Sequence, residues 1–203
     1  MAEVTTAERI LDAAEALFVE HGFAETSMRA ITQRAGVNLA AVNYHFGSKS
    51  ALIQSVFSRH FDPFAELFQT TLAQWAERTP TLEELVDALM YCALNTPSSH
   101  GDLRVFMKLI GLAYTQQQGD LRAYVQTHYA VLFERFMSLM AKATPELDSQ
   151  ERFWRLHFLL GSVVFTLSSL DTLRGMTAPN ASQASIRALA QTIRPMAIAA
   201  LRA

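Results

Sequence analysis

The segment from 26 to 49, TSMRAITQRAGVNLAAVNYHFGSK, constrains the fold more than any other part of the chain. It begins with two hydroxyl residues that can cap a helix, and its first half ends at Gly36, a stop because glycine reaches positive φ without steric cost. Asn38 can cap a second helix. Apolar residues at helical spacing would hold the pair together; they are Met28, Ile31, Ala35, Val42 and Phe46. The pattern predicts two short helices joined by a tight turn.

The outward residues of this predicted pair suit the DNA major groove. Asparagine can pair with adenine, and leucine and alanine can contact thymine methyl groups. Tyrosine, histidine and lysine suit phosphate contacts, which position a protein without reading sequence. The residues predicted to contact DNA are Thr26, Ser27, Arg29, Asn38, Leu39, Ala40, Ala41, Asn43, Tyr44, His45 and Lys49. The alternative is an ordinary helical pair whose polar face is only solvated.

Charge is distributed unevenly around this segment. Residues 26–61 contain no Asp or Glu, whereas the preceding residues are rich in both. The cations of this stretch are Arg29, Arg34, Lys49 and Arg59, and the preceding acids are Glu3, Glu8, Asp12, Glu15, Glu20 and Glu25. The net charge of the whole chain, -2, therefore conceals a local basic segment. The charge of the local surface matters more for binding a nucleic acid than the net charge of the protein.

A longer stretch, from Glu8 to Phe57, resembles the tetracycline-repressor family of one-component bacterial regulators. The resemblance rests on ERILDAAEALFVEHGFAETSMRAI, then AGV, then NYHFGSKSALIQSVF. It implies that the first third binds DNA and that the rest dimerises and holds a small ligand. Departures from the family pattern at Thr32, Leu39 and Asn43 imply a base readout that is less electrostatic than usual. NLAAVNYHFGSK together with LIGLAYTQ is similar to fatty-acid-responsive regulators of the PsrA type.

Composition favours an all-α protein with a substantial core. Of the 203 residues, 50% are hydrophobic and 18% charged, and Gly and Pro are sparse at 8 and 6. We expect about nine helices: a three-helix DNA-binding head in residues 1–50 and a helical ligand-binding and dimerisation body in residues 51–203. Long helices are expected from 49 towards 75, with a possible kink at Pro63, and over 121–143 and 149–173.

The single Cys92 excludes an internal disulfide and fits a reducing compartment. Its expected role is that of a small buried hydrophobe, with a redox sensor as the alternative. The N-terminus is acidic and amphipathic, unlike a signal peptide, and the longest apolar run, 156–170, is shorter than the ~20 residues of a membrane span. We therefore expect a cytoplasmic protein.

Large apolar side chains of the predicted body could line a ligand cavity, since ligand sites are mostly apolar with a few polar anchors. Arg104 and Lys108 share a helix face and could hold a carboxylate or phosphate, with His100 beside them. The predicted ligand-binding residues are Phe68, Leu72, Met90, Arg104, Phe106, Lys108, Leu109, Ile110, Tyr114, Phe133, Phe136, Met137 and Phe158. The alternatives are a simple core and a solvated basic face. The PsrA-type likeness implies a long-chain fatty acid or its coenzyme A thioester as the effector.

The last two long helices are expected to form a homodimer contact, because they combine small and apolar residues. The small ones are Gly161, Ser162, Ser168, Ser169, Ala190, Ala197 and Ala200, and the apolar ones are Leu160, Val164, Leu167, Ile186, Leu189 and Ile193. A two-fold dimer would place two recognition helices about 34 Å apart, one turn of DNA or a multiple of it. The target should then be an inverted-repeat operator in double-stranded DNA.

These observations favour a transcriptional repressor that an effector releases from DNA. A helix-turn-helix regulator without ligand response is the near alternative. A carrier of apolar ligands is another, and it would not need the acid-free segment. An enzyme is disfavoured because the histidines, at 21, 45, 60, 100, 128 and 157, show no metal-binding spacing and no GxSxG or phosphate-binding loop occurs. We expect no metal and no cofactor.

Overall fold

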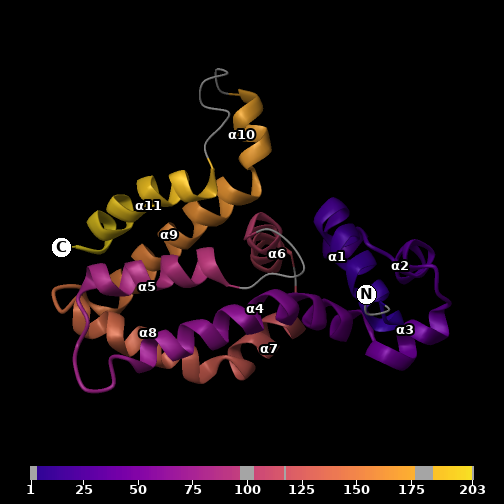
Figure 1. The fold of residues 1–203 in the computed structure, drawn as a ribbon, viewed down its shortest axis with the longest axis horizontal. Coiled ribbons are helices and arrows are strands. Elements are labelled where there is room, and N and C mark those ends of the chain that lie inside the picture. Colours follow the sequence, from indigo (N-terminus) through magenta and orange to yellow (C-terminus); the bar gives the residue numbers. More distant parts are fainter. Residues whose placement is uncertain (1–3, 97–102, 117, 177–184, 203) are drawn as a thin grey trace. The chain divides into compact units, whose positions relative to one another are not determined.

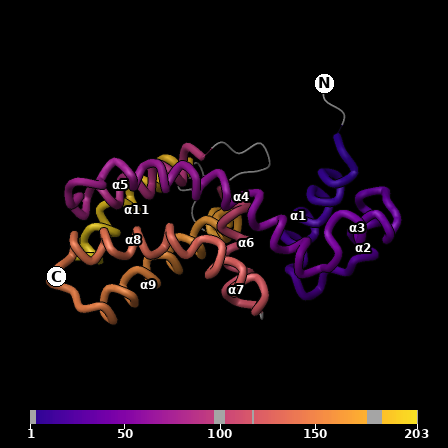
Figure 2. Tube along the Cα trace, turned by 90° about the horizontal axis from the view of Figure 1, so that it is seen from below, coloured from indigo at the N-terminus to yellow at the C-terminus, as the bar shows by residue number. Residues whose placement is uncertain are grey.

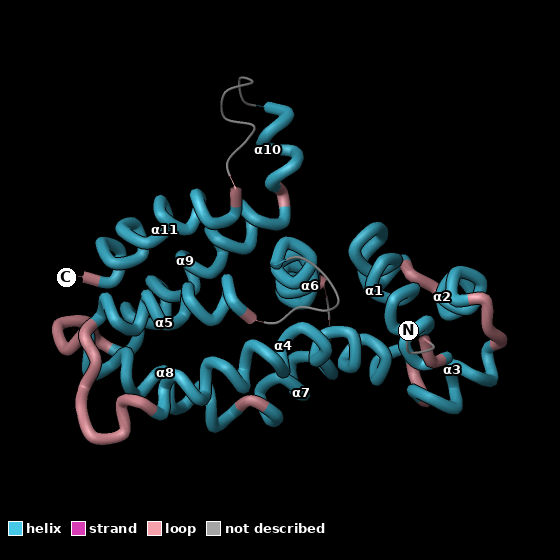
Figure 3. The backbone as a smooth tube through the Cα atoms, in the orientation of Figure 1, coloured by secondary structure: helices cyan, strands magenta, loops and turns pink. Residues whose placement is uncertain are grey.

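The structure, a computed structural model, describes residues 4–96, 103–116, 118–176 and 185–202, and within these ranges it is helical without a strand (Figures 1 and 3). The all-α prediction is confirmed. The helices are α1 (Thr6–Glu25), α2 (Met28–Ala35), α3 (Leu39–Phe46), α4 (Lys49–Ala73), α5 (Leu82–Asn95), α6 (Leu103–Thr115), α7 (Gly119–His128), α8 (Ala130–Ala143), α9 (Ser149–Ser168), α10 (Leu170–Met176) and α11 (Ile186–Leu201).

The described ranges hold eleven helices where about nine were expected, mainly because two predicted long helices are each broken. One divides into α7 and α8 at Tyr129, and the other into α9 and α10 at Ser169, with a bend of 71°. Neither break contains Gly or Pro, so the residue pattern carries no signal for it. Across the described ranges no single helix has the length and apolarity to cross a membrane, although α9 with α10 would pass that test if the bend were ignored.

The chain divides into two compact units. Unit 1 comprises residues up to 62 and residues 98–128, and unit 2 comprises residues 63–97 and 129–203. Helix α4 contributes to both, and the division falls at Pro63, through which the helix continues. Unit 1 therefore contains α6 and α7 in addition to the predicted three-helix head. The head and body boundary placed at residue 50 stays a prediction.

In unit 1, α1, α2 and α3 pack against one another, as Figures 1 and 2 show. Their helix ends are fixed by side chains: Thr5 forms a capping box with Glu8, and Ser27 and Asn38 accept from the amides of Ala30 and Ala41. Gly36 ends α2 in the left-handed conformation, at φ 65°. The buried apolar residues of this head include Ile10, Ala14, Phe18, Ile31 and Val42.

In unit 2, α11 packs against α5 and α9. Arg194 on α11 donates two hydrogen bonds to Asp87 on α5, of 2.5 and 2.8 Å, and Arg202 pairs with Glu83. Cys92 is buried beside the Thr71 hydroxyl, and burial raises the pKa of its thiol. A buried, protonated thiol is a poor nucleophile, which supports the packing role of Cys92 over the redox alternative.

Candidate nucleic-acid interface

Helix α3 presents a polar face that is free of acidic residues. Val42 is fully buried against the head and Phe46 is half-buried, so the opposite side faces outward. Tyr44 is 85% exposed, and its ring meets that of His45 edge-on at 5.1 Å. The exposed residues of this face are Asn38, Leu39, Ala40, Asn43, Tyr44 and His45, and Ala41 is half-buried. The pattern of exposure is thus the one that the residue spacing predicts.

Several residues predicted to contact DNA make bonds within the head. Thr26 is only 2% exposed, and its hydroxyl donates to the carbonyls of Leu17 and Gly22 at 3.1 and 2.7 Å. Thr26 therefore lies inside the fold, where it closes the end of α1, and its contact with DNA stays a prediction. Ser27 and Asn38 remain exposed, but their side-chain oxygens are engaged as helix caps.

The acid-free segment is less basic in space than in sequence. Arg34 donates two hydrogen bonds of 2.8 Å to Glu20 on α1, and this lowers the pKa of the Glu20 carboxyl. Arg59 pairs with Asp12, also on α1, at 2.5 Å. The acids that precede the segment in sequence thus neutralise two of its four cations, while Arg29 is exposed.

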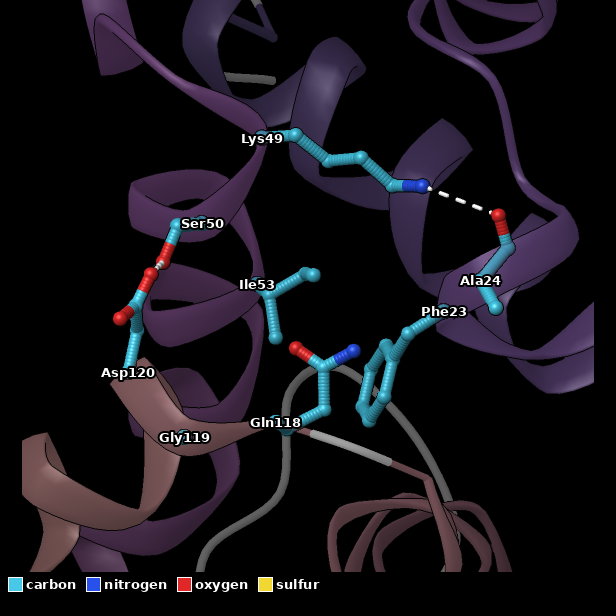
Figure 4. A pocket seen from close by; sticks show the side chains of 8 residues that line it. All are labelled: Phe23, Ala24, Lys49, Ser50, Ile53, Gln118, Gly119 and Asp120. Carbon is cyan, nitrogen blue, oxygen red and sulfur yellow. Dashed lines mark hydrogen bonds between the residues drawn. The ribbon is translucent and has the colours of Figure 1, made fainter.

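The fourth cation, Lys49, lies at a groove of about 350 Å³ within unit 1 (Figure 4). Its Nζ donates to the carbonyl of Ala24 at 3.2 Å, and Ser50 donates to Asp120 on α7 at 2.8 Å. The groove is lined by Phe23, Ala24, Lys49, Ser50, Ile53, Gln118, Gly119 and Asp120. None of the predicted ligand-binding residues belongs to it.

Helix α1 has a kink at Gly22, where φ is 83° and ψ is 170°. The next two amides, of Phe23 and Ala24, both donate to Oε1 of Gln116 at the end of α6, at 2.9 and 3.2 Å. A Cβ atom at position 22 would lie 2.4 Å from Nε2 of Gln116. The sequence pattern predicted that His21-Gly22-Phe23 ends the first helix, but the chain resumes helical geometry to Glu25.

The predicted ligand-binding residues fall into both units. In unit 1, Phe106 packs against Phe57, His60 and Phe61 with ring centroids 5.9 Å away, and Arg104 and Lys108 are half-buried. In unit 2, Phe68 lies 5.5 Å from Phe136. The remaining buried or half-buried members are Leu72, Met90, Leu109 and Ile110, and the exposed ones are Tyr114, Phe133, Met137 and Phe158. His100 lies outside the described residues. A pocket formed by this set stays a prediction.

Helix α9 carries a row of exposed aromatic residues that the sequence interpretation did not assign to a surface. Trp154, Phe158 and Phe165 are all exposed, Phe158 by 68%, and their spacing places them on one face of the helix with Gly161 between them. Phe158 is also one of the predicted ligand-binding residues. Leu167, predicted for a dimer contact, is buried within the chain itself.

Two family profiles match this chain, one near its start and one over its later part. Residues 10–56 match the profile of "Bacterial regulatory proteins, tetR family", and residues 87–200 match "Tetracyclin repressor-like, C-terminal domain". A probable HTH-type transcriptional regulator, YttP of Bacillus subtilis, is 29% identical over 105 residues, 52% of this chain and 50% of that protein. The chain thus spans about half the length of that curated relative.

Solved structures share the fold over nearly the whole chain. AmtR of Mycobacterium smegmatis is 23% identical with a TM-score of 0.64, covering 97% of this chain and 86% of its own. The fatty acid degradation regulator FadR from Bacillus halodurans is 16% identical with a TM-score of 0.62, covering 98% and 97%. At these identities the likeness concerns the fold alone.

Proposed function

This chain belongs to the tetR family of bacterial regulatory proteins, and from that premise we propose that it is a dimeric repressor released from an inverted-repeat operator by a small effector. The observation that carries the proposal is the exposed, acid-free face of α3, held rigidly by the buried Val42 and by caps at the starts of α2 and α3. A protein of this design reads DNA by placing one helix in the major groove. A cytoplasmic location follows from this function and stays a prediction.

In this reading α3 is the recognition helix. Asn43 would pair with adenine, while Leu39 and Ala40 would contact thymine methyl groups. Tyr44 and His45, with the exposed Arg29 at the start of α2, would contact phosphates and set the position of the helix. Because two of the cations in the segment are paired with α1, phosphate contacts are few and base readout is largely uncharged.

The test is binding of the purified protein to a pool of random DNA duplexes at low salt, followed by titration of the selected sequence. We expect an inverted repeat with half-sites one helical turn or a multiple apart. Tyr44→Ala should weaken binding to all sequences alike, whereas Asn43→Ala should relax preference at one base pair, a loss of roughly 5- to 150-fold. Lys142→Ala, at an exposed position on α8, is the control and should bind as the parent does. A protein that selects no sequence would contradict the proposal.

We also propose that α9 and α11 form the dimer interface. The exposed row of Trp154, Phe158 and Phe165 is an apolar surface of the kind that marks a protein contact, and Gly161 in its middle allows a second helix to approach closely. Met196 adds an exposed apolar residue on α11. A second copy of the same face is the occupant that a two-fold operator requires.

Phe158→Glu should therefore convert the dimer to a monomer at micromolar concentration, because a carboxylate would be desolvated at the centre of the interface. Sedimentation velocity gives the mass, and operator affinity should fall with it. Val131→Glu, at an exposed apolar position on α8, is the matched control and should remain dimeric. A dimer that survived the Phe158 change would place the interface on another face.

For the effector we propose an amphipathic acyl compound, a long-chain fatty acid or its thioester. The support is the similarity of LIGLAYTQ, most of α6, to fatty-acid-responsive regulators, and the fold shared with a fatty acid degradation regulator. Half-buried Arg104 and Lys108 lie one turn apart on α6, where a carboxylate could pair with them. The effector releases DNA only if it binds the released state more tightly than the DNA-bound one.

Mass spectrometry of what co-purifies with the native protein tests this proposal. We expect acyl chains, retained less by Lys108→Glu than by the control Lys142→Glu on α8, because only the first removes a cation from α6. An acyl compound added to the protein–DNA complex should lower operator affinity. Recovery of an unrelated compound, or release that ignores Lys108, would contradict the acyl proposal and leave DNA binding intact.

A further inference from the structure

The contact between Gln116 and α1 points to a role in regulation. We propose that Gln116 is a positioning residue through which α6 sets the conformation of the head and so its affinity for DNA. This inference rests on the proposed DNA-binding function and names the device by which the rest of unit 1 acts on it. All of the residues involved lie within unit 1.

The backbone of α1 after Gly22 depends on hydrogen-bond acceptors from outside the helix. At Gly22 the chain leaves helical geometry, so the amides that follow need acceptors from elsewhere. A single oxygen, Oε1 of Gln116, accepts from both Phe23 and Ala24. The absence of a side chain at Gly22 is what lets the amide of Gln116 approach so closely. The kink and the glutamine therefore form one arrangement.

The kinked segment supports the start of α2. The carbonyl of Ala24 accepts from Lys49, and the carbonyl of Gly22 accepts from the buried hydroxyl of Thr26. Ser27 follows directly and caps α2. The residues held by Gln116 thus lie just before the cap of α2, and α3 packs on α2 and α1. A displacement of the kink would be transmitted to the recognition helix.

Helix α6 also contacts the rest of unit 1 near its start. Phe106, near the start of α6, packs on Phe57, His60 and Phe61 of α4, and its ring is nearly parallel to the His60 ring, at 10°. His60 in turn hydrogen-bonds Glu15 of α1 at 2.9 Å. Because α6 is anchored at both ends, a shift along its axis must break the Gln116 bonds or carry α1 with it.

Linkage makes this coupling measurable from the DNA side without knowing the effector. If α6 influences the affinity of the head for DNA, then DNA must change the stability of α6 by the same free energy. Two variants separate the hydrogen bonds from the space they occupy. Gln116→Glu keeps an acceptor oxygen, whereas Gln116→Met keeps the length of the side chain and removes the acceptor.

The experiment measures amide hydrogen exchange by NMR on the full chain, free and bound to the selected operator duplex. In the free protein, Gln116→Met should speed exchange at Phe23 and Ala24 about tenfold or more, because their acceptor is lost, while Gln116→Glu stays near the parent. On adding DNA, amides of α6 should become slower in the parent and in Gln116→Glu but not in Gln116→Met. Gln126→Met, an exposed glutamine on α7, is the control.

Each other outcome would overturn the inference in a distinguishable way. Unchanged exchange at Phe23 and Ala24 in Gln116→Met would show that the contact does not protect these amides. Faster exchange there, with a normal DNA response of α6, would make Gln116 a structural residue only. If the parent binds no DNA, the proposed function fails and the coupling with it, even where the free protein shows the protected amides.

Discussion

Gly22→Ala should destabilise unit 1 by about 3–5 kcal/mol and lower operator affinity with it. With φ at 83° and ψ at 170°, Gly22 occupies a region that is open essentially to glycine alone, and an alanine there costs about 1–3 kcal/mol. Its Cβ would also meet Nε2 of Gln116 at 2.4 Å. The glutamine is flexible and can withdraw, but it then gives up its bonds to Phe23 and Ala24, at about 1 kcal/mol each.

Two other glycines separate these contributions. Gly36 also has positive φ, but a Cβ there would meet only Arg9, at 3.9 Å, so Gly36→Ala should show the backbone cost alone. Gly175 is helical with open space around it, so its alanine variant should be neutral or slightly stabilising. In thermal unfolding the melting temperature should be lowest for Gly22→Ala, intermediate for Gly36→Ala and highest for Gly175→Ala. Each kcal/mol of lost stability should lower it by about 2–4 °C. Equal effects at positions 22 and 175 would show that the kink is not held in solution.

The local structure of the head follows from the sequence because its determinants are local. A capping side chain acts on an amide three residues away, and Gly36 stops its own helix. The outward face of α3 is likewise set by helical periodicity around Val42. For these features the residue pattern alone predicted the structure.

Features that depend on distant residues could not be predicted in this way. Gln116 lies 93 residues from the amide of Phe23 that it accepts from. The sequence presents Arg34 as one of the cations of the segment, but in the structure it is paired with Glu20 of the neighbouring helix α1. Thr26 could be a cap, a DNA contact or a buried donor, and only the packing of α1 decides between them.

The exposed aromatic row on α9 shows a limit of composition. Composition predicts Phe158 in a pocket because large apolar residues are usually interior, but an apolar side chain is equally suited to an interface. Small residues predict a dimer contact on α9 and α11, but they do not single out Trp154 and Phe165, whose exposure only the structure shows. The side of α9 that faces its own chain depends on how α11 packs against it. Helical periodicity shows which residues share a face, but it does not show which face is buried.

Arg152→Met should destabilise unit 2 by roughly 2–4 kcal/mol, far more than loss of a surface arginine. Arg152 is 8% exposed, and its guanidinium donates to the hydroxyl and carbonyl of Thr144 and to the carbonyl of Leu147, at 2.8, 3.0 and 2.5 Å. These acceptors lie at the end of α8 and in the loop that follows, where the helix dipole also favours a cation. Methionine fills similar space but leaves those oxygens without their donor.

The matched control is Arg78→Met, which breaks an exposed pair with Glu84 in the same unit. That pair is close, at 2.6 Å, and it helps to lower the pKa of Glu84 to about 2, but solvent screens it, so the stability should change little. Urea unfolding followed by circular dichroism gives both free energies. If the two variants unfolded alike, the bonds of Arg152 would contribute no more than a surface ion pair, and the junction of α8 and α9 would be held by apolar packing of Leu139, Met140 and Leu147 instead.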